Sequence, residues 1–479
     1  MKECVLIVDI STSKVQANLI GLISGDLLEH TIYTYQWIHP FSGWSEVDAN
    51  AIWESTQEAV EDVIEIGKNK YAITAIGFSW FGDNLLLVGS DGVPLGNMIL
   101  SFDNRAGTEA QQLLDEYGEE KLIEVAGFPI QGDAVPAKVL WFKKYKPQEF
   151  NKAAYFLSIQ QFIIMKLGLG IITDYSLACR KIMFEIKNLR WSESLCNYLG
   201  LPVEKLGENV LPANSIIGSI RKFGNVDLGR EIPVILGAHN SESGMIGLGC
   251  FPGSDAVLAN LSSTFDLIGY LVSSYSDKYA GFLGSYCGPF EGSYAILGST
   301  IPGPNLDWLI KIFYPDEGQS ALNQLFEMYP LDGTNKTILS KGIQTGDGII
   351  RGLNLTTTQE DLFKAVIEGV TFPLMGVISQ LEKVNENKFD SVRIGGSGAR
   401  FDRWSQLKAD MFGVRVEKVK NIEVSSMGAA IMAAVELGHF QNYPEAMKQM
   451  IGIDKIFEPR PEINQRYKKR FEEYLEIVG

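Results

Sequence analysis

Residues 4–14 read CVLIVDISTSK, an apolar run that ends at Asp9 and leads into a turn rich in hydroxyl groups. A short apolar run bounded by turn residues predicts a buried strand. A second apolar run passes through Ile20 and Leu22, and residues 24–26 (SGD) then turn the chain into a third strand. The chain is therefore predicted to open with a hairpin that continues as a meander.

A helix and further strands are expected after this opening. Asp48 is a suitable N-cap for a helix whose apolar side includes Ile52 and Val60. Two more strands are expected near residues 73–80 and 84–89. Strands in a meander, then a helix, then more strands are typical of a mixed sheet covered by helices. The predicted fold class is therefore α/β.

The second half of the chain repeats the opening pattern. Residues 255–261 are apolar, residues 262–264 (SST) form a hydroxyl-rich turn, and residues 267–272 are apolar again. Two hairpins with the same turn chemistry indicate two related domains. Further elements are predicted as a helix near 359–385, a strand at 392–394, a glycine-rich segment at 395–398, a helix from about Arg403, a strand at 414–419 and a helix at 426–437.

The domains are predicted as residues 1–248 and 249–479, because the most suitable boundary lies near residues 247–249. That segment does not have the composition of a linker, so the two domains are expected to pack and hinge.

Composition and charge limit the possible classes of function. With 479 residues, 46% hydrophobic and 21% charged, the chain resembles soluble globular proteins of two or more domains. The formal net charge of −16 repels a phosphate backbone, so nucleic acid is not an expected partner. ATP remains possible as a ligand, because backbone N–H groups and a metal ion can supply local positive potential.

The cysteines and the N-terminus bear on location. The five cysteines are widely spaced and include no Cys-x-x-Cys pair, which favours buried free thiols in a reducing compartment. The first apolar run is too short for a signal peptide or a membrane span. We therefore expect a cytoplasmic protein with no membrane partner, and the sequence leaves open whether it forms a homodimer.

Several ordered blocks resemble the FGGY family of carbohydrate kinases, and the similarity runs along nearly the whole chain. Residues 43–48 (GWSEVD) are similar to the family's Gly-Trp-x-Glu-x-Asp block, and residues 103–105 (DNR) to its Asp-x-Arg. Each block alone is weak, but their shared order is strong evidence. The other similar blocks are residues 136–138, 140–141, 173–176 and 365–369, the glycine-rich segment with Arg400 and Trp404, and Glu423 before residues 428–430.

This resemblance, to xylulokinases, fuculokinases and gluconokinases in particular, implies two actin-like (ribonuclease H-like) domains with a ligand cleft between them. It also implies transfer of the γ-phosphoryl group of ATP to a sugar or polyol hydroxyl, which depends mostly on positioning and charge neutralisation. Residues 79–83 (SWFGD) are similar to the deoxyhexulose kinases of the family, which hints at fuculose or rhamnulose.

The resemblance also assigns expected roles, with ATP and Mg²⁺ as the cofactors. Small residues in a turn leave N–H groups free to face phosphate oxygens, and carboxylates orient sugar hydroxyls. The implied metal ligand is Asp9; the implied substrate contacts are Trp44, Asp83, Asp103, Arg105 and Asn240; and the implied nucleotide contacts are Ser11, Thr12, Ser13, Ser263, Thr264, Gly396, Ser397, Gly398 and Ala399.

The chain departs from the family at the catalytic position. The family's general base is an aspartate in a Gly-x-x-Asp segment, and here residues 237–240 read GAHN. The Asn240 amide cannot accept the proton, and losing a base that contributes about 10²–10⁴-fold would raise the barrier by roughly 3–5.5 kcal/mol. Ser11 and Ser263 also stand where both phosphate turns usually have glycine. If these positions need φ > 0, each serine costs about 1–2 kcal/mol.

Two functions therefore remain open: a slow kinase, and a catalytically inactive pseudokinase that serves as a sugar- and nucleotide-binding module. His239 and Glu242 flank Asn240, but neighbours at a helix start point in different directions, so neither inherits its geometry automatically, and a substitute base stays open. Structural roles are the alternatives for several residues: packing for Trp44, charge pairing for Arg105, a satisfied core position for His239, and close helix–strand contact for residues 395–399.

Overall fold

A computed structural model of the chain describes residues 1–130, 134–253, 257–279, 284–314, 316, 320–343, 348–385 and 388–478. The chain groups into two compact units. Unit 1 comprises Met1–Gly247, Leu271–Ala295 and Ser425–Met450, and unit 2 comprises Leu248–Tyr270, Ile296–Val424 and Ile451–Gly479. The division into family domains at residues 248 and 249 stays a prediction, because spatial compactness does not define such domains.

Unit 1 is built on a mixed sheet. Its strands are β1 (Lys2–Ile10), β2 (Lys14–Gly21), β3 (Leu27–Thr34), β5 (Tyr71–Trp80), β13 (Ile216–Phe223), β14 (Val226–Ile235) and β15 (Ala238–His239). They follow the order β13-β14-β5-β1-β2-β3, and β15 pairs with β5. Strands β1 and β2 form the expected antiparallel hairpin, whereas β5 runs parallel to both β1 and β15.

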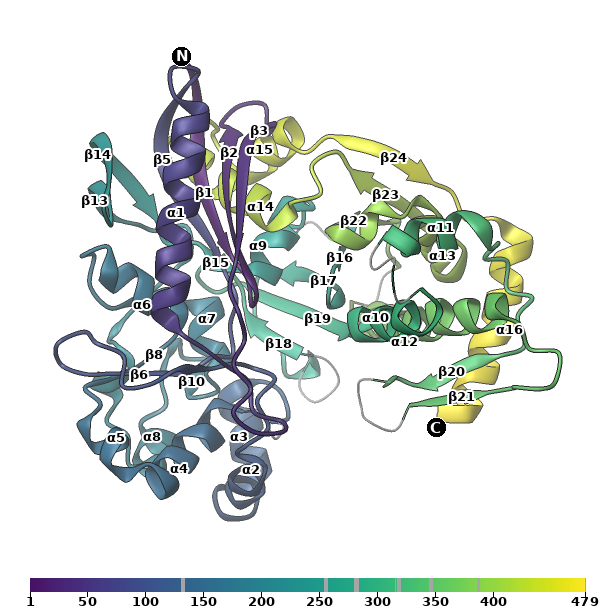
Figure 1. Cartoon of the computed structure of the whole chain (residues 1–479), viewed down its shortest axis with the longest axis horizontal. Coiled ribbons are helices and arrows are strands. Elements are labelled where there is room, and N and C mark those ends of the chain that lie inside the picture. The colour runs from purple at the N-terminus through teal and green to yellow at the C-terminus, as the bar shows by residue number, and fades with distance from the viewer. Residues whose placement is uncertain are drawn as a thin grey trace. The chain divides into compact units, whose positions relative to one another are not determined.

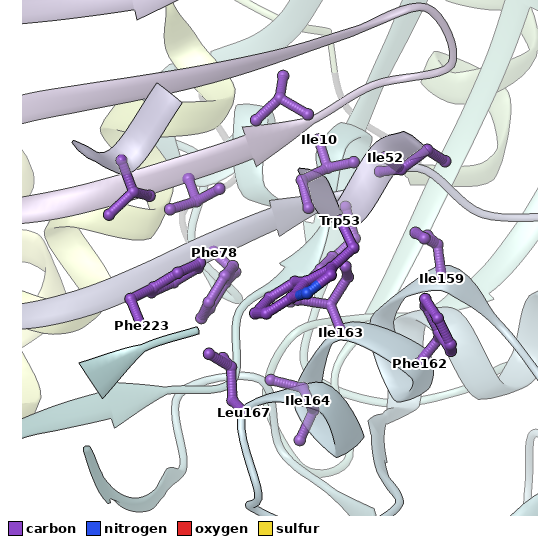
Figure 2. Close-up of a cluster of buried hydrophobic side chains, with 14 of the residues drawn as sticks. Ile10, Ile52, Trp53, Phe78, Ile159, Phe162, Ile163, Ile164, Leu167 and Phe223 are labelled. Carbon is purple, nitrogen blue, oxygen red and sulfur yellow. The ribbon is translucent and has the colours of Figure 1, made fainter. Parts of the chain in front are cut away.

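The main core of unit 1 lies between this sheet and helix α1 (Ala49–Gly67), which runs along one face of the sheet (Figure 1). As predicted, Asp48 caps α1, and its carboxylate accepts a hydrogen bond from the Asn50 N–H at 2.9 Å. Figure 2 shows Trp53 of α1 among buried side chains from several elements, including Phe78 and Phe223. The Trp53 and Phe223 rings stack with their centroids 5.8 Å apart.

Smaller elements complete unit 1. They include three helices that later hold site residues: α7 (Tyr175–Arg180), α9 (Asn240–Gly247) and α14 (Val424–Glu436), whose first residue belongs to unit 2. The remaining helices are α2 (Gly107–Leu113), α3 (Glu119–Ala126), α4 (Val135–Tyr145), α5 (Pro147–Lys152), α6 (Ile159–Lys166), α8 (Glu193–Leu199) and α15 (Tyr443–Met450). The short strand pairs are β4 (Glu46–Val47) with β7 (Met98–Ile99), β6 (Leu86–Val88) with β8 (Tyr155–Leu157), β9 (Ile172–Asp174) with β12 (Asn209–Leu211), and β10 (Phe184–Glu185) with β11 (Arg190–Trp191).

Unit 2 has its own sheet and helices. Within the described residues, the seven strands of this sheet are β16 (Val257–Ser262), β17 (Asp266–Val272), β18 (Gly284–Cys287), β19 (Tyr294–Thr300), β22 (Ser391–Gly395), β23 (Arg415–Val419) and β24 (Ile453–Phe457). A separate pair is formed by β20 (Ile338–Lys341) and β21 (Ile349–Arg351). The helices are α10 (Pro302–Phe313), α11 (Ser320–Met328), α12 (Gln359–Asn385), α13 (Asp402–Phe412) and α16 (Pro461–Val478). Residues 254–256, at the start of the predicted strand, lie outside the described residues.

The two sheets repeat one arrangement. In unit 1 the hairpin β1–β2 is followed across the sheet by β5, parallel to β1. In unit 2 the hairpin β16–β17 is followed by β22, parallel to β16. A hydroxyl-rich turn joins the two strands of each hairpin. The prediction of an α/β fold with two related halves is therefore confirmed.

Two further expectations can be compared with the structure. All five cysteines are buried and free, as the spacing indicated. In the part of the chain that the structure describes, α12 is the one helix long and apolar enough to cross a membrane, but 67% of its most apolar window is buried. Phe363, Ile367 and Phe372 of α12 belong to the apolar core of unit 2, as is usual for a core helix of a globular protein.

Candidate functional site

Three of the predicted site residues emerge at one edge of the unit 1 sheet. Strands β1, β5 and β15 are parallel, and their register pairs Asp9 with Ser79, and Ser79 with Ala238. Asp83 follows the end of β5, and Asn240 follows the end of β15 at the start of α9. Since the carboxyl ends of parallel strands are where α/β sheets bind ligands, this edge is the candidate site.

The carbonyl groups of the first hydroxyl-rich turn point toward Tyr35 and Trp37, which follow β3. The Ser13 carbonyl accepts from the Tyr35 N–H at 3.2 Å, the Thr12 carbonyl accepts from Trp37 Nε1 at 2.7 Å, and the Ser11 carbonyl accepts from the Tyr35 hydroxyl. Among the described residues, none accepts a hydrogen bond from the backbone N–H of Thr12 or Ser13. The turn can therefore offer two N–H groups to an anion.

Ser11 itself closes the turn. Its N–H and its hydroxyl donate to the Lys14 carbonyl at 2.9 and 3.0 Å. Among the described residues, the non-glycine positions with positive φ are Asn69, Asp83, Ile182 and Leu189. Neither Ser11 nor Ser263 has the strained conformation considered above, so the expected cost of 1–2 kcal/mol does not arise.

Asp83 adopts a left-handed conformation with φ of 58°, directly beside a buried arginine. Arg180, at the end of α7, lies 3.6 Å from the Asp83 carboxylate through Nη1 and 2.9 Å from that of Glu242 through Nη2. The guanidinium also lies 4.1 Å from the centre of the Tyr286 ring. Although burial opposes it, the Arg180 charge lowers the pKa of Glu242 to about 2. Glu242 is therefore ionised at neutral pH.

His239 is held from both its backbone and its ring. Its N–H donates to the Ser176 hydroxyl at 2.8 Å, and that hydroxyl donates to Asp174 at 2.5 Å. Its ring Nδ1 lies 2.6 Å from the Ser241 hydroxyl and 3.0 Å from a Glu242 carboxylate oxygen. Burial, and then the charge of Arg180, lower the pKa of His239 below its ordinary value of 6.5.

Asn240 begins α9, and α14 fixes its backbone. The Ser425 hydroxyl donates to the Asn240 carbonyl at 2.9 Å, and the Ser243 hydroxyl donates to the Ser425 carbonyl at 2.8 Å. A Cβ on Gly428 of α14 would overlap the Ser243 carbonyl oxygen. Close contact between the two helices therefore sets where Asn240 stands, and its side chain remains partly exposed.

Trp44, Asp103 and Arg105 form a second cluster whose polar atoms are largely engaged with one another. Asp103 is fully buried, accepts from the Ser45 N–H at 2.6 Å, and holds Arg105 through Nε at 2.7 Å and Nη2 at 2.6 Å. The Arg105 guanidinium lies 3.9 Å from the centre of the half-buried Trp44 ring. In this arrangement Asp103 orients Arg105, and the part of the Trp44 ring that Arg105 does not cover is available to a ligand.

In unit 2 the glycine-rich segment lies against the second hydroxyl-rich turn. Gly396 has φ of 91°, and a Cβ there or on Gly398 would overlap Ser262. Ser263 mirrors Ser11, since its N–H and hydroxyl donate to the Phe265 carbonyl at 2.8 and 3.3 Å. Ser263, Thr264 and Ser397 are exposed, whereas Gly398 and Ala399 are buried. Both the packing role and the nucleotide role proposed for this segment are compatible with that placement.

The residues at the sheet edge are compatible with magnesium. Within the described residues, no group of three His, Cys, Asp or Glu side chains forms a closed metal site. Mg²⁺ in phosphoryl-transfer sites usually needs only one or two carboxylates, with water and substrate phosphates as its other ligands. Asp9 is a partly buried carboxylate two residues before the first turn, so it could hold such an ion.

Sequence reasoning missed several residues of these clusters. Arg180, Ser241 and Tyr286 meet at the Asp83 loop, and Lys408 of α13 meets the second turn from more than a hundred residues away. The Lys408 ammonium lies 2.6 Å from Asp266 and 3.0 Å from the Ser262 hydroxyl. A signal was available for Arg180, which ends the largely apolar segment YSLACR of α7. Helix α13 also carries Asp402, Arg403 and Asp410, so its pattern does not single out Lys408.

Comparison with family models accounts for most of the chain. Residues 4–247 match the description "FGGY family of carbohydrate kinases, N-terminal domain", and residues 328–437 match the corresponding C-terminal domain.

Similar proteins extend over the full length. The chain is 27% identical to a xylulose kinase of Staphylococcus epidermidis, covering 100% of this chain and 97% of that protein. It is 28% identical to a xylulose kinase of Bacillus subtilis, covering 98% and 95%. Among solved structures, a ligand-bound xylulose kinase and a gluconate kinase of Lactobacillus acidophilus each superpose with a TM-score of 0.87 at 24% identity, covering 99% of this chain and 97% of theirs. The last two similarities speak for the fold alone.

Proposed function

Because this chain belongs to the FGGY family of carbohydrate kinases, we propose that it transfers the γ-phosphoryl group of ATP to a hydroxyl of a sugar or polyol. The observation that carries the proposal is the common edge of β1, β5 and β15, where Asp9, Asp83 and Asn240 emerge beside a turn. In that turn the N–H groups of Thr12 and Ser13 have no acceptor among the described residues. Similarity to xylulose kinases over the full length makes a ketopentose the first substrate to test.

Each group in the proposed mechanism has a definite task. Asp83 accepts hydrogen bonds from sugar hydroxyls, and Trp44 packs against the sugar face. The N–H groups of Thr12 and Ser13 bind phosphate oxygens, and the glycine-rich segment of unit 2 leaves room for the nucleotide. A magnesium ion held by Asp9 would neutralise phosphate charge when bound. The Asn240 amide can orient a hydroxyl but cannot accept its proton.

The experiment is sugar-dependent formation of ADP from Mg-ATP across ketopentoses, deoxyhexuloses, polyols and aldonic acids, with the wild-type protein beside Asn240→Asp. Turnover of one class by the wild type supports the kinase. The second candidate, a pseudokinase, is favoured by the missing carboxylate at Asn240. It predicts that calorimetry detects sugar and nucleotide binding while both proteins form no ADP.

A further inference from the structure

The hydrogen bonds around His239 determine which ring nitrogen carries the proton. The Ser241 hydroxyl donates to the Glu242 carboxylate at 2.6 Å, and its oxygen accepts from Arg180 Nη2 at 3.0 Å. The second lone pair of that oxygen can accept from His239 Nδ1, also at 2.6 Å. Glu242 itself lies 3.0 Å from Nδ1. The Ser241 N–H also points at Nδ1, but from a longer 3.2 Å. An ionised carboxylate and a hydroxyl acceptor together favour a proton on Nδ1, which leaves a lone pair on Nε2.

Nε2 faces the loop that carries the predicted sugar ligand. A Cβ built on Gly82 would lie 2.8 Å from His239 Cδ2 and 3.1 Å from Nε2, so the ring edge lies directly over this glycine. Asp83 is the next residue. All hydrogen bonds of the ring to described residues use Nδ1, and 11% of the side chain is exposed. A hydroxyl held by Asp83 and Asn240 would therefore approach the Nε2 edge.

Three charged groups from three elements surround the ring: Arg180 of α7, Glu242 of α9, and Asp83 after β5. Burial and Arg180 together keep the imidazole neutral at pH 7, while Glu242 and Asp83 act in the opposite direction. After proton uptake, the imidazolium would face the Glu242 carboxylate directly and through Ser241. The site can thus accept a proton on Nε2 and compensate the new charge.

We propose that His239 replaces the missing carboxylate as the general base, with Ser241 and Glu242 as its positioning residues. This inference rests on the proposed kinase function. The proton of the sugar hydroxyl passes to Nε2 while the hydroxyl oxygen forms its bond to the γ-phosphorus. The bond between that phosphorus and the bridging oxygen breaks, and ADP leaves with the electron pair. No further reactant is needed.

The decisive experiment tests whether a carboxylate at position 240 restores the kcat that is lost when His239 is replaced. His239→Asn keeps an amide donor in place of Nδ1–H and removes the Nε2 lone pair. We expect kcat to fall by about 10²–10⁴-fold while calorimetry shows unchanged ATP affinity. Adding Asn240→Asp to that variant should return kcat to within about tenfold of the wild type. If His239 were purely structural, Asn240→Asp would raise kcat by a similar factor in the wild type and in His239→Asn, whereas a histidine base predicts a much larger rise in His239→Asn.

The pH profile tests the same inference in the unaltered protein. The kcat of the wild type should show an acid limb that lies below the ordinary histidine pKa of 6.5, because burial and Arg180 lower the pKa of His239 and a protonated imidazole cannot act as a base. In the doubly substituted protein the acid limb should move down toward the ordinary carboxylate pKa of about 4. A wild-type kcat with no acid limb at any pH at which the protein stays folded would overturn the role of His239, even if His239→Asn does not fold.

The outcomes separate this inference from the proposed function. Equal kcat in the wild type and His239→Asn, or a silent wild type beside an active Asn240→Asp, overturns the histidine base and leaves the kinase standing. Silence of all variants on every sugar overturns the kinase itself.

Discussion

Asp83 combines an unusual backbone with an exposed functional group. Its φ of 58° is tolerated by aspartate better than by most residues, because the short polar side chain can bond locally, yet it still costs roughly 1 kcal/mol or more. The neighbouring Gly82 cannot carry a side chain without meeting Arg180 and His239. The conformation therefore aims a carboxylate at the sheet edge at the expense of local stability.

Replacing Asp83 should separate stability from substrate binding. Asp83→Gly removes the strain, so we expect the free energy of unfolding to stay constant or to rise by up to about 1 kcal/mol, while the KM for the sugar rises at least about tenfold. The control Asp83→Asn tolerates the same φ and should change stability by less than about 0.5 kcal/mol while also raising KM. Urea unfolding and steady-state kinetics measure both quantities. An unchanged KM in both variants would remove Asp83 from the sugar site.

Lys181 gives the fold a defined pH dependence. It is buried, its ammonium donates to the Phe156 carbonyl and to the Gln161 side chain at 2.8 Å each, and burial lowers its pKa to about 7. The unfolded lysine titrates near 10.5, so between pH 7 and pH 10.5 the unfolded chain binds more protons. The free energy of unfolding attributable to Lys181 must therefore rise with pH in that window, by at most about 1.4 kcal/mol per unit.

Lys181→Met tests this dependence. Between pH 7 and pH 9 the wild type should gain about 2 kcal/mol in unfolding free energy relative to the variant, because methionine does not titrate. Urea unfolding of both proteins at the two pH values measures the difference. A difference that does not change with pH would show that Lys181 keeps its charge in the folded state.

At the scale of elements, one helix contact in each unit holds predicted site residues in place. In unit 1, α14 presses Gly428 against the backbone of α9 and so fixes Asn240. In unit 2, α13 carries Lys408 to the base of the second turn, where Asn260 and Asp266 flank the ammonium at 2.9 and 2.6 Å. Gly428 cannot carry a side chain unless the backbone moves. Lys408 cannot be replaced by an apolar residue without leaving Asp266 as a buried, unpaired charge.

Gly428→Ala should be strongly destabilising. The new methyl group would lie 2.6 Å from the Ser243 carbonyl carbon and nearer still to its oxygen, so the helices must separate. We expect a loss of about 3 kcal/mol or more in unfolding free energy, and lower activity because Asn240 moves. Gly107→Ala, in helix α2 with nothing within 4 Å, is the control and should change stability by less than about 1 kcal/mol. Equal stability of the two variants would contradict the close contact.

Lys408→Met should weaken unit 2 and the second turn together. Removing one partner of a buried ion pair leaves Asp266 uncompensated, which typically costs about 3–5 kcal/mol. We also expect a higher KM for ATP with an unchanged KM for the sugar. Lys455→Met is the control, because that lysine is 52% exposed beside Asp402 and should cost less than about 1 kcal/mol. A KM for ATP equal to that of the wild type would leave Lys408 with a purely structural role.

At the scale of the whole molecule, the same hairpin with a hydroxyl-rich turn occurs once in each unit, and in each turn a serine, Ser11 or Ser263, donates its hydroxyl to a carbonyl two or three residues later. The net charge of −16 means that attraction for a nucleotide must come from these local N–H groups and from a metal ion. A ligand that binds the folded protein raises its free energy of unfolding, so nucleotide binding can be measured through that free energy.

Mg-ATP at about 100 times its Kd should raise the unfolding free energy by about 2.7 kcal/mol. Removing magnesium with EDTA should reduce this stabilisation in the wild type, because Asp9 then faces phosphate charge without compensation. In Asp9→Asn the effect of EDTA should be clearly smaller. Thermal unfolding with and without nucleotide measures it, and equal responses of the two proteins would exclude Asp9 as the metal ligand.

The sequence alone determined the local elements and the family. Alternating apolar runs, the Asp48 cap and the small-residue turns are short-range signals, and they predicted both hairpins and helices such as α12 and α14 because neighbouring residues carry that information. The ordered blocks identified the kinase family, and the exchange at Asn240 was visible by position.

Which side chains meet depends on how the chain folds in three dimensions. Arg180 reaches Glu242 across 62 positions and Lys408 reaches Ser262 across 146, and no local pattern records such distances. The contacts of Asp103 with Arg105 and the Ser45 N–H were likewise not visible in the sequence, and its place near the sugar stays a prediction. Whether His239 can act as a base beside Asn240 depends on the direction in which its imidazole ring points. Strand register and helix packing fix that direction, and sequence spacing does not.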